Sequence, residues 1–295
     1  MVEEVVKGLI IKSISGEFSV SSGDEIYVCK PRGILKYKDQ NVKVGDYVDI
    51  DPLSKSIIKI YPRKNDLVRP VIANVDKSFL VFSVKEPDLN LNLLDRLIAV
   101  MEYNDIKPII VFSKIDLLSD DTKCMEEYQI IKKYYQKIGY KVYEASVNFD
   151  EKDIIREFDD CVCVLAGQSG VGKSSILNRI DDTLLLRTNE ISHALGRGKH
   201  TTRHIELHKI GNGYLADSPG FGIVDFFDMD ELALSHTFVE MFEESQNCKF
   251  SKCLHINEPK CRVKELVEKG EILKSRYENY LLFNKEIEKN KKNKY

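Results

Sequence analysis

Residues 167–174 read Gly167-Gln168-Ser169-Gly170-Val171-Gly172-Lys173-Ser174, and this stretch decides the fold. It matches the pattern G-x-x-x-x-G-K-[ST], in which successive backbone N–H groups surround the α- and β-phosphates of a nucleotide. We expect Lys173 to reach the β- and γ-phosphate oxygens and the Ser174 hydroxyl to ligate Mg²⁺. The stretch therefore predicts a P-loop domain of the α/β class.

The residues on either side of the loop agree with this prediction. Residues 161–166 form a continuous apolar run that is typical of a buried parallel strand, and residues 174–180 have the apolar spacing of a helix. A strand, a glycine-rich turn and a helix N-terminus together make an anion site. A chance glycine-rich turn is the alternative, and the agreement of both flanks disfavours it. The predicted phosphate-binding residues are Gly167, Gln168, Ser169, Gly170, Val171, Gly172, Lys173, Ser174 and Ser175.

A segment that looks like a guanine-reading box precedes the phosphate loop in the chain. Residues 107–112 read as a buried strand, and Ser113-Lys114-Ile115-Asp116 follows it. Asp116 can accept hydrogen bonds from guanine N1–H and N2–H₂, which adenine lacks, and Lys114 would pack along the base. Such a box usually begins with Asn or Thr, and Ser113 has a shorter reach. Residues 141–146 resemble the last strand and the small-residue turn that covers the base, which adds Ser146 to the predicted guanine site.

Two switch-type segments follow the phosphate loop. Asp217-Ser218-Pro219-Gly220 comes after a short strand-like stretch and would place a carboxylate near the metal and a glycine N–H near the γ-phosphate. Upstream of it, residues 196–203 form a glycine-hinged polar segment. Thr201 or Thr202 would complete the Mg²⁺ shell, and we favour Thr202. Such a segment alone is more often a surface loop, so its assignment depends on the flanking motifs.

The order of these parts is unusual, because the phosphate loop comes first in ordinary GTPases. Here the chain runs from base box and base-covering turn to phosphate loop, first switch and second switch. The termini of an open α/β domain often lie close together at the surface, so rejoining them and cutting the chain elsewhere leaves the same sheet and site. The order predicts a circularly permuted GTPase domain over residues 65–225.

A second group of ligating residues lies in the C-terminal part of the chain. The spacing C-x4-C-x-H-x5-C offers three thiols and one imidazole, a set suited to one closed, structural, tetrahedral Zn²⁺ site. The alternative is a group of reduced cysteines in a small core. Other cysteines are scattered and do not suggest a disulfide framework. We predict a mostly helical zinc-binding module over residues 226–295, with the ligands Cys248, Cys253, His255 and Cys261.

The N-terminal part alternates polar with apolar residues in short segments that turns separate. These segments are residues 17–20, 25–28 and 42–50. Several short strands of this kind predict a small all-β barrel over residues 1–64, and an OB-fold, which commonly holds oligonucleotides, is the leading candidate. A generic solvated barrel stays open as the alternative, because residues 1–64 carry 11 Lys and Arg against 9 Asp and Glu.

Across nearly its whole length the chain resembles the circularly permuted GTPases of the RsgA type, which depend on the small ribosomal subunit. The permuted motif order and the zinc pattern carry this resemblance. It implies a GTP hydrolase, stimulated by the small ribosomal subunit, that binds the subunit and its rRNA late in assembly and leaves after hydrolysis. The family is thought to use a histidine of the first switch for catalysis, which here is His200, because Phe221 occupies the place of the water-orienting Gln of many GTPases. A phosphate contact or structural hydrogen bond is the alternative role of His200.

Length and charge limit the partners. At 295 residues the chain should hold two or three domains, and its net charge of −3 argues against general affinity for nucleic acid, so RNA contact would come from local patches. The acidic start Met1-Val2-Glu3-Glu4 is no signal peptide, and no apolar run approaches a membrane span. We therefore expect a cytoplasmic monomer that binds GTP or GDP with Mg²⁺ and has no membrane partner.

Two other functions stay open at this stage. One is an RNA-binding translation or assembly factor in which GTP signals occupancy and turnover is incidental. The other is a P-loop ATPase or small-molecule kinase, which Asp116 and the lack of a substrate domain disfavour. Stimulation of GTP turnover by small ribosomal subunits separates the first from a GTPase, and a preference for ATP would favour the second.

Overall fold

The computed structural model describes residues 5–33, 41–68, 70–146, 152–180, 205–217, 225–226 and 228–293. The chain divides into two compact units, each built from segments that are distant in sequence. Unit 1 consists of Met1–Phe79, Asp150–Leu165 and Lys173–Phe221. Unit 2 consists of Leu80–Phe149, Ala166–Gly172 and Gly222–Tyr295.

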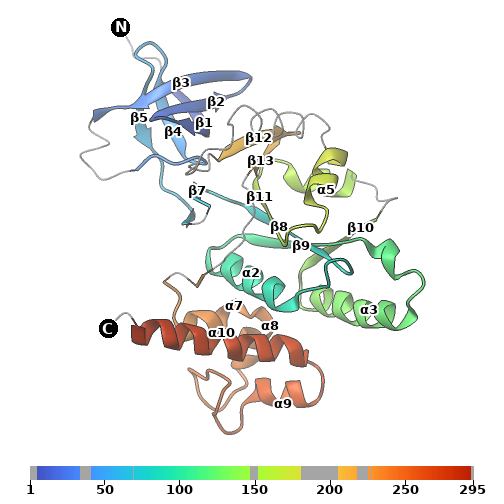
Figure 1. Ribbon diagram of the computed structural model, residues 1–295. Helices are drawn as coiled ribbons and strands as arrows, with labels where there is room; N and C mark the ends of the chain where they lie inside the picture. The colour runs from blue at the N-terminus through green and yellow to red at the C-terminus, as the bar shows by residue number, and fades with distance from the viewer. Residues whose placement is uncertain are drawn as a thin grey trace. The chain divides into compact units, whose positions relative to one another are not determined.

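A closed five-stranded barrel forms the N-terminal part of unit 1 (Figure 1). Strand β1 pairs with both β2 and β4, and β3 pairs with β5, so the hydrogen-bonded ladder returns to its start. Ile10, Val20 and Ile57 are fully buried inside it. The predicted all-β barrel is confirmed. Its strands are β1 (Val6–Ile14), β2 (Glu17–Ser22), β3 (Glu25–Pro31), β4 (Tyr47–Asp51) and β5 (Ser56–Ile60).

The chain before β4 turns instead of continuing the strand that the alternation of residues 42–50 suggested. Gly45 has φ +89°, and a Cβ atom there would lie 2.0 Å from the Ala73 carbonyl oxygen. Asp46, which comes next, is fully buried and accepts two hydrogen bonds from the Arg63 guanidinium, at 2.7 and 2.9 Å. A left-handed glycine and a buried ion pair therefore end the alternation at this point.

Side-chain amides hold the segment that leaves the barrel. Asn65 exchanges two hydrogen bonds with the backbone of Val75, at 2.8 and 2.9 Å. The Asn74 side chain donates to the Gly45 carbonyl oxygen at 2.8 Å and accepts from Lys64 N–H at 3.0 Å. The two short strands of this segment are β6 (Asp66–Leu67) and β7 (Ile72–Ala73). These bonds satisfy the backbone of a connection that is buried for much of its length.

Unit 1 continues into an α/β layer. Strand β13 pairs in parallel with β11 and antiparallel with β12, and β12 pairs antiparallel with β1 of the barrel. The strands are β11 (Val162–Ala166), β12 (Glu206–Ile210) and β13 (Gly213–Asp217), and the helices are α4 (Lys152–Ile155), η2 (Arg156–Phe158) and α5 (Lys173–Ile180). Strand β8 (Lys77–Ser83) begins in unit 1 and ends in unit 2.

Unit 2 contains the parallel strands β9 (Lys107–Ser113) and β10 (Lys141–Ala145). Beside them lie α2 (Leu91–Tyr103), η1 (Ile115–Leu118) and α3 (Thr122–Lys137) (Figure 1). Asn90 caps α2 by accepting from Leu93 N–H, and Asp121 caps α3 by accepting from Cys124 N–H. Strand β9 is buried over residues 108–113, as a parallel strand covered on both faces requires.

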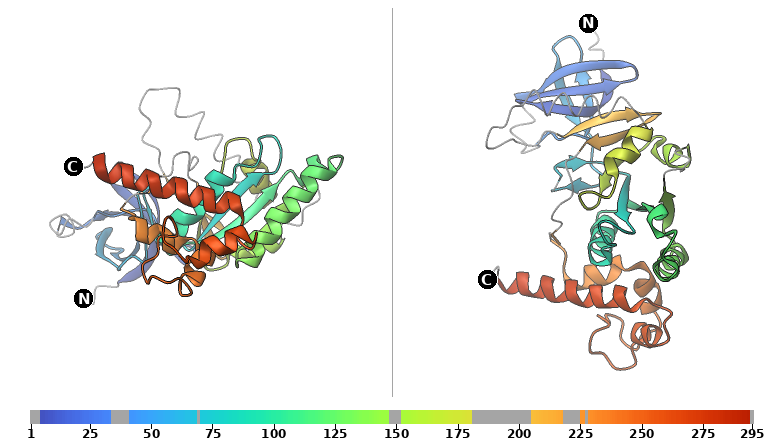
Figure 2. Two further views of the ribbon diagram at one scale, coloured as in Figure 1. Left: turned by 90° about the horizontal axis from the view of Figure 1, so that it is seen from below. Right: turned by 45° about the vertical axis from the view of Figure 1, so that its right-hand side comes forward.

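The C-terminal helices pack on α2, and α10 runs beside α2 and α7 in each view (Figure 2). Their core contains Leu234, Phe238, Tyr280 and Phe283, together with Ala99 of α2. Among the described residues no helix is both long and apolar enough to cross a membrane. The predicted helical module is confirmed in α7 (Glu231–Thr237), α8 (Val239–Ser245), α9 (Arg262–Glu268) and α10 (Lys274–Asn293).

A buried ion cluster crosses this packing. The Arg276 guanidinium of α10 donates to Asp95 of α2 at 2.7 Å and to Glu240 of α8 at 2.5 Å. Tyr135 of α3 donates to the same Asp95 oxygen at 2.6 Å. All of these groups are buried, so removing one partner would leave an unpaired charge in the core and destabilise the fold. The cluster fixes α10 and α8 against the helices that flank β9 and β10.

Candidate nucleotide-binding and metal sites

The loop that follows β11 adopts a backbone that its glycines permit. Gly167, Gly170 and Gly172 have φ values of +140°, +81° and +91°. A Cβ atom on Gly167 would lie 2.0 Å from the carbonyl oxygen of Val81 in β8. Glycine is therefore required here both for the backbone conformation and for the close approach of the loop to the neighbouring strand.

Helix α5 begins at Lys173, directly after the loop. The Lys173 side chain is half-buried, and burial lowers the pKa of its ammonium group. A bound phosphate would restore favourable surroundings for that charge. Ser174 and Ser175 are exposed in the first turn of the helix, where unpaired backbone N–H groups attract anions. The predicted phosphate-binding residues thus form the loop after β11 and the start of α5.

Ser113 connects the predicted guanine box to the phosphate loop. Its hydroxyl is buried and donates to the Val171 carbonyl oxygen at 2.5 Å. The short side chain suits this contact, because Val171 is itself fully buried at the centre of the loop. We predicted a role for Ser113 at the base, and in the structure its hydroxyl holds the loop backbone. No sequence signal indicates this bond, because the two residues are 58 positions apart.

The rest of the box meets the turn that we predicted to cover the base. Lys114 adopts the left-handed conformation with φ 58°, and its N–H donates to the Ala145 carbonyl oxygen at 3.1 Å. Its ammonium group donates to the Glu86 carbonyl oxygen. Ser113 lies opposite Ala145 in the β9–β10 ladder, so the box and Ser146 leave the same edge of the sheet. Ile115 and Asp116 begin η1, and the Asp116 carboxylate is exposed there.

Glu144 supports this edge of the sheet, and the sequence did not single it out. The Tyr128 hydroxyl donates to one carboxylate oxygen at 2.6 Å, and the Lys132 ammonium group donates to the other at 2.5 Å. Burial alone would raise the pKa of Glu144, but the bonds from Lys132 and Tyr128 outweigh it and lower that pKa. Helix α3 thereby fixes the residue that directly precedes Ala145 and Ser146.

The switch segments are described only in part. Asp217 is the last residue of β13, and β13 runs parallel to β11, so both strands end at the same edge of the sheet. This placement of the Asp217 backbone agrees with a role near the nucleotide phosphates. The other predicted switch residues, which are His200, Thr201, Thr202 and Gly220, lie outside the described residues.

The four predicted metal ligands converge in unit 2. Their ligand atoms all lie within 4.8 Å of one another. The His255 Nδ1 atom is 3.7 Å from the Cys248 sulfur and 3.4 Å from the Cys261 sulfur, and these two sulfurs are 3.9 Å apart. A tetrahedral zinc ion, with bonds of about 2.3 Å to sulfur and about 2.1 Å to nitrogen, requires separations of about 3.8 Å and about 3.6 Å. The three separations among Cys248, His255 and Cys261 are therefore close to those of a zinc site.

The surroundings of the cluster also suit a metal. Burial raises the pKa of Cys253 to about 12 and lowers the pKa of His255. The imidazole is thus held neutral and able to ligate, whereas the thiol needs a cation in order to lose its proton. The hydroxyls of Tyr277 and Tyr280 donate to the carbonyl oxygens of His255 and Leu254, each at 2.6 Å. These bonds hold the backbone that carries two of the ligands.

Comparisons with known proteins show the family of the chain. Residues 60–227 match the family described as RsgA GTPase, and residues 7–57 match the RsgA N-terminal domain. The small ribosomal subunit biogenesis GTPase RsgA of Halalkalibacterium halodurans is 47% identical, over 98% of this chain and 99% of the relative. The protein of that name from Bacillus anthracis is also 47% identical, over 97% of this chain and 98% of the relative.

Solved structures are similar over the same length. The crystal structure of YloQ, described as a circularly permuted GTPase, has a TM-score of 0.83 and 39% identity, and the match covers 97% of this chain and 96% of YloQ. The crystal structure of YjeQ from Thermotoga maritima has a TM-score of 0.83 and 32% identity, with 96% and 98% of the two chains covered. The predicted permutation of the α/β domain is thus confirmed.

Replacing Ser113 tests the bond between the box and the loop. Ser113→Ala leaves the buried Val171 carbonyl oxygen without its hydroxyl donor, at a cost of about 1–2 kcal/mol, or roughly 5–30-fold in guanine nucleotide affinity. Titration with a fluorescent GDP measures this change. Ser119→Ala is the matched control, because Ser119 is exposed just after η1. This variant should bind GDP with the affinity of the unaltered protein. Equal affinities for both variants would contradict the assignment.

Proposed function

Since this chain belongs to the RsgA GTPase family, we propose that it hydrolyses GTP to GDP and phosphate and acts in the biogenesis of the small ribosomal subunit. The observation that carries this proposal is the hydrogen bond from Ser113 to Val171, because it joins a guanine-reading segment to a phosphate-binding loop. One nucleotide with a guanine base and a phosphate chain matches that pair of segments.

Each part of the nucleotide has its own partners in this proposal. The backbone N–H groups of the glycine-rich loop surround the phosphates, and Lys173 supplies positive charge to the β- and γ-phosphate oxygens. Asp116 accepts from the guanine N1–H and N2–H₂ groups. Ser174, Asp217 and a threonine of the first switch are the proposed residues around Mg²⁺, which neutralises charge on the β- and γ-phosphates when it is bound. We favour Thr202 over Thr201 for that threonine.

The water-orienting residue differs from that of many GTPases. Phe221 follows the second switch box, and a phenyl ring cannot orient water by hydrogen bonding. We assign this role to His200 in the first switch, whose imidazole can accept a proton or hydrogen bond from the attacking water. The contribution of the small ribosomal subunit would be to bring the switch into its catalytic arrangement.

The barrel offers a local surface for rRNA. Lys59 Nζ lies 4.3 Å and Lys7 Nζ 4.6 Å from the centre of the Tyr61 ring, and Lys7 also lies 6.0 Å from the ring of Tyr47. Aromatic rings flanked by cations bind unpaired bases by stacking and phosphates by charge. Such a patch permits RNA binding in a chain whose net charge is −3. We expect the protein to act in the cytoplasm as a monomer.

We assign one structural Zn²⁺ to Cys248, Cys253, His255 and Cys261. The separations of these ligands support the assignment, as does the buried neutral imidazole of His255. All four positions belong to protein side chains, which leaves no coordination site for substrate. When bound, the ion connects the segment before α9 to the rest of the C-terminal helices and so stabilises them.

GTP turnover in the presence of ribosomal subunits tests the proposed function. The protein alone should hydrolyse GTP slowly, and small subunits should accelerate this reaction, whereas large subunits or ATP in place of GTP should not. His200→Ala should lower the stimulated turnover by about 100-fold, the low end of general acid–base contributions, and leave GTP affinity unchanged. His236→Ala, an exposed histidine of α7, is the matched control.

The outcomes of this assay separate the open functions. A response to small subunits that persists in His200→Ala would remove the histidine from the mechanism but keep the GTPase. Small subunits that leave the turnover of the unaltered protein unchanged would favour the alternative function. That alternative is an RNA-binding factor that nucleotide gates and whose turnover is incidental.

Removal of the metal should affect stability rather than nucleotide binding. We expect about one zinc ion per chain in the purified protein, released by a chelator with a fall in the unfolding temperature. Cys253→Ser should lose the metal and show the same fall, whereas Cys124→Ser, outside the cluster, should retain it. Metal analysis and thermal unfolding measure both effects. Full stability in metal-free protein would contradict a structural zinc site.

A further inference from the structure

The hairpin of β12 and β13 links the barrel to the strand of the phosphate loop. In sequence it follows the predicted first switch and ends at Asp217 of the second. On one side β13 pairs in parallel with β11, with Tyr214 opposite Val162 and Ala216 opposite Val164. On the other side β12 pairs with β1 of the barrel, with Glu206 opposite Lys12. A displacement of the barrel strand therefore acts directly on the hairpin.

Two side-chain contacts hold the barrel on the hairpin. The Lys12 ammonium group lies 2.6 Å from the Glu206 carboxylate, and the two side chains are 30% and 26% exposed. The Tyr214 hydroxyl of β13 hydrogen-bonds to the Ser21 hydroxyl of β2 at 2.9 Å. Because β1 and β12 share a single paired position, these side chains supply much of the specific contact between the barrel and the hairpin.

A bulge in β1 creates this contact. The first half of the strand, up to Leu9, pairs with β4, and the register with β2 shifts between Ile10 and Lys12. A bulge of this kind bends the strand and redirects the next side chain. It turns β1 away from β4 and places Lys12 opposite Glu206. Strand β1 thus pairs with β2 along one edge, while its other edge pairs with β4 in the first half and with β12 at Lys12.

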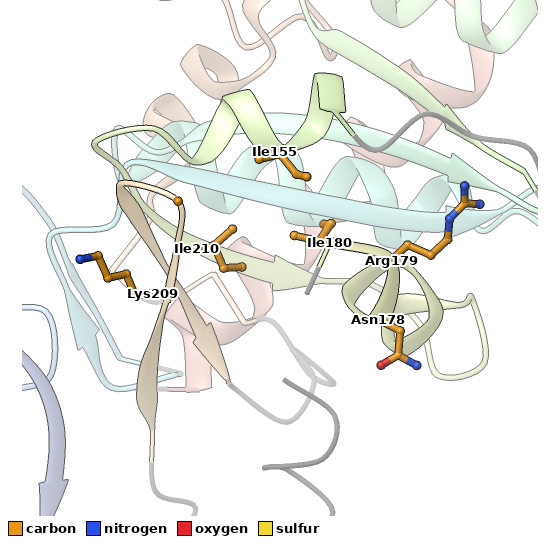
Figure 3. A pocket seen from close by; sticks show the side chains of 7 residues that line it. Ile155, Asn178, Arg179, Ile180, Lys209 and Ile210 are labelled. Carbon is orange, nitrogen blue, oxygen red and sulfur yellow. The ribbon is translucent and has the colours of Figure 1, made fainter. Parts of the chain in front are cut away.

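The opposite side of the hairpin is held closely. A Cβ atom on Gly213 would lie 1.7 Å from the Phe158 carbonyl oxygen, and Tyr214 N–H donates to the Cys161 carbonyl oxygen at 2.8 Å. In Figure 3, Ile210 points toward Ile180 at the end of α5, whereas Lys209 points away from it. The hairpin therefore has little freedom against β11, and its contact with the barrel fixes it from the other side.

We propose that Glu206 and Tyr214 are positioning residues that couple RNA binding by the barrel to GTP binding, by fixing the hairpin that ends at Asp217. The inference rests on the proposed function. RNA that holds the barrel in one position fixes β1, and β1 fixes β12 and β13 through these contacts. Coupling of this kind is reciprocal, so bound GTP must raise the affinity for RNA by the same factor as RNA raises the affinity for GTP.

The affinity of the protein for purified small ribosomal subunits, measured with GDP and with a non-hydrolysable GTP analogue, tests this coupling. For the unaltered protein, the dissociation constant measured with GDP divided by that measured with the GTP analogue should exceed one. Glu206→Gln should lower that ratio by about threefold, the scale of one partly exposed ion pair. Tyr214→Phe, which removes only the hydroxyl, should lower it as well. Both variants should still bind and hydrolyse GTP, so a lower ratio would not reflect loss of the nucleotide site.

A charge reversal and a matched control complete the experiment. The double variant Lys12→Glu with Glu206→Lys should restore the ratio that each single reversal loses. Glu17→Gln, which removes an exposed ion pair with Lys30 in the same barrel, should leave the ratio unchanged. Variants that lower the affinity equally with both nucleotides would show a merely structural contact and overturn the inference, although GTPase activity would stand. Failure of the unaltered protein to bind small subunits would overturn the proposed function as well.

Discussion

The structure depends on the close approach of the phosphate loop to the strands beside it. Gly167 leaves no room for a Cβ atom against the Val81 carbonyl oxygen, and the Ser113 hydroxyl holds the Val171 carbonyl oxygen from the next strand. These two contacts fix the backbone of the loop from two neighbouring strands. The segment that we propose to read guanine begins at the same Ser113, so the contact that shapes the loop also sets its position relative to that segment.

The permuted order determines which parts this site is connected to. The chain enters the α/β layer from the barrel through β8, and the barrel also contacts the β12–β13 hairpin through Lys12 and Glu206. In unit 2, Arg276 of α10 donates to Asp95 of α2, which ties α10 to the helix that follows β8. Ion pairs thus hold the barrel on the β12–β13 hairpin and the C-terminal helices on α2.

Features that are local in sequence were predictable. The phosphate loop and the metal ligands each lie within one short segment, where residue type and spacing identify the chemistry. The bond from Ser113 to Val171 and the cluster around Arg276 could not be predicted, because their partners meet only in the folded chain. Strand β1 was missed because its bulge breaks the alternation that marks a strand. His200 and the threonines of the first switch stay predictions.

The central claim is that residues 113–116 read a guanine base whose phosphates lie in the loop after β11. The most direct test measures the affinities of Asp116→Asn for GTP and for xanthosine triphosphate, because this substitution should exchange the base specificity. An Asn amide loses the charged acceptor for the guanine N–H groups but can donate to the xanthine C2 oxygen. The account predicts GTP binding weaker by about 10- to 100-fold and a gain in xanthosine triphosphate binding. Unchanged GTP affinity in this variant would contradict it.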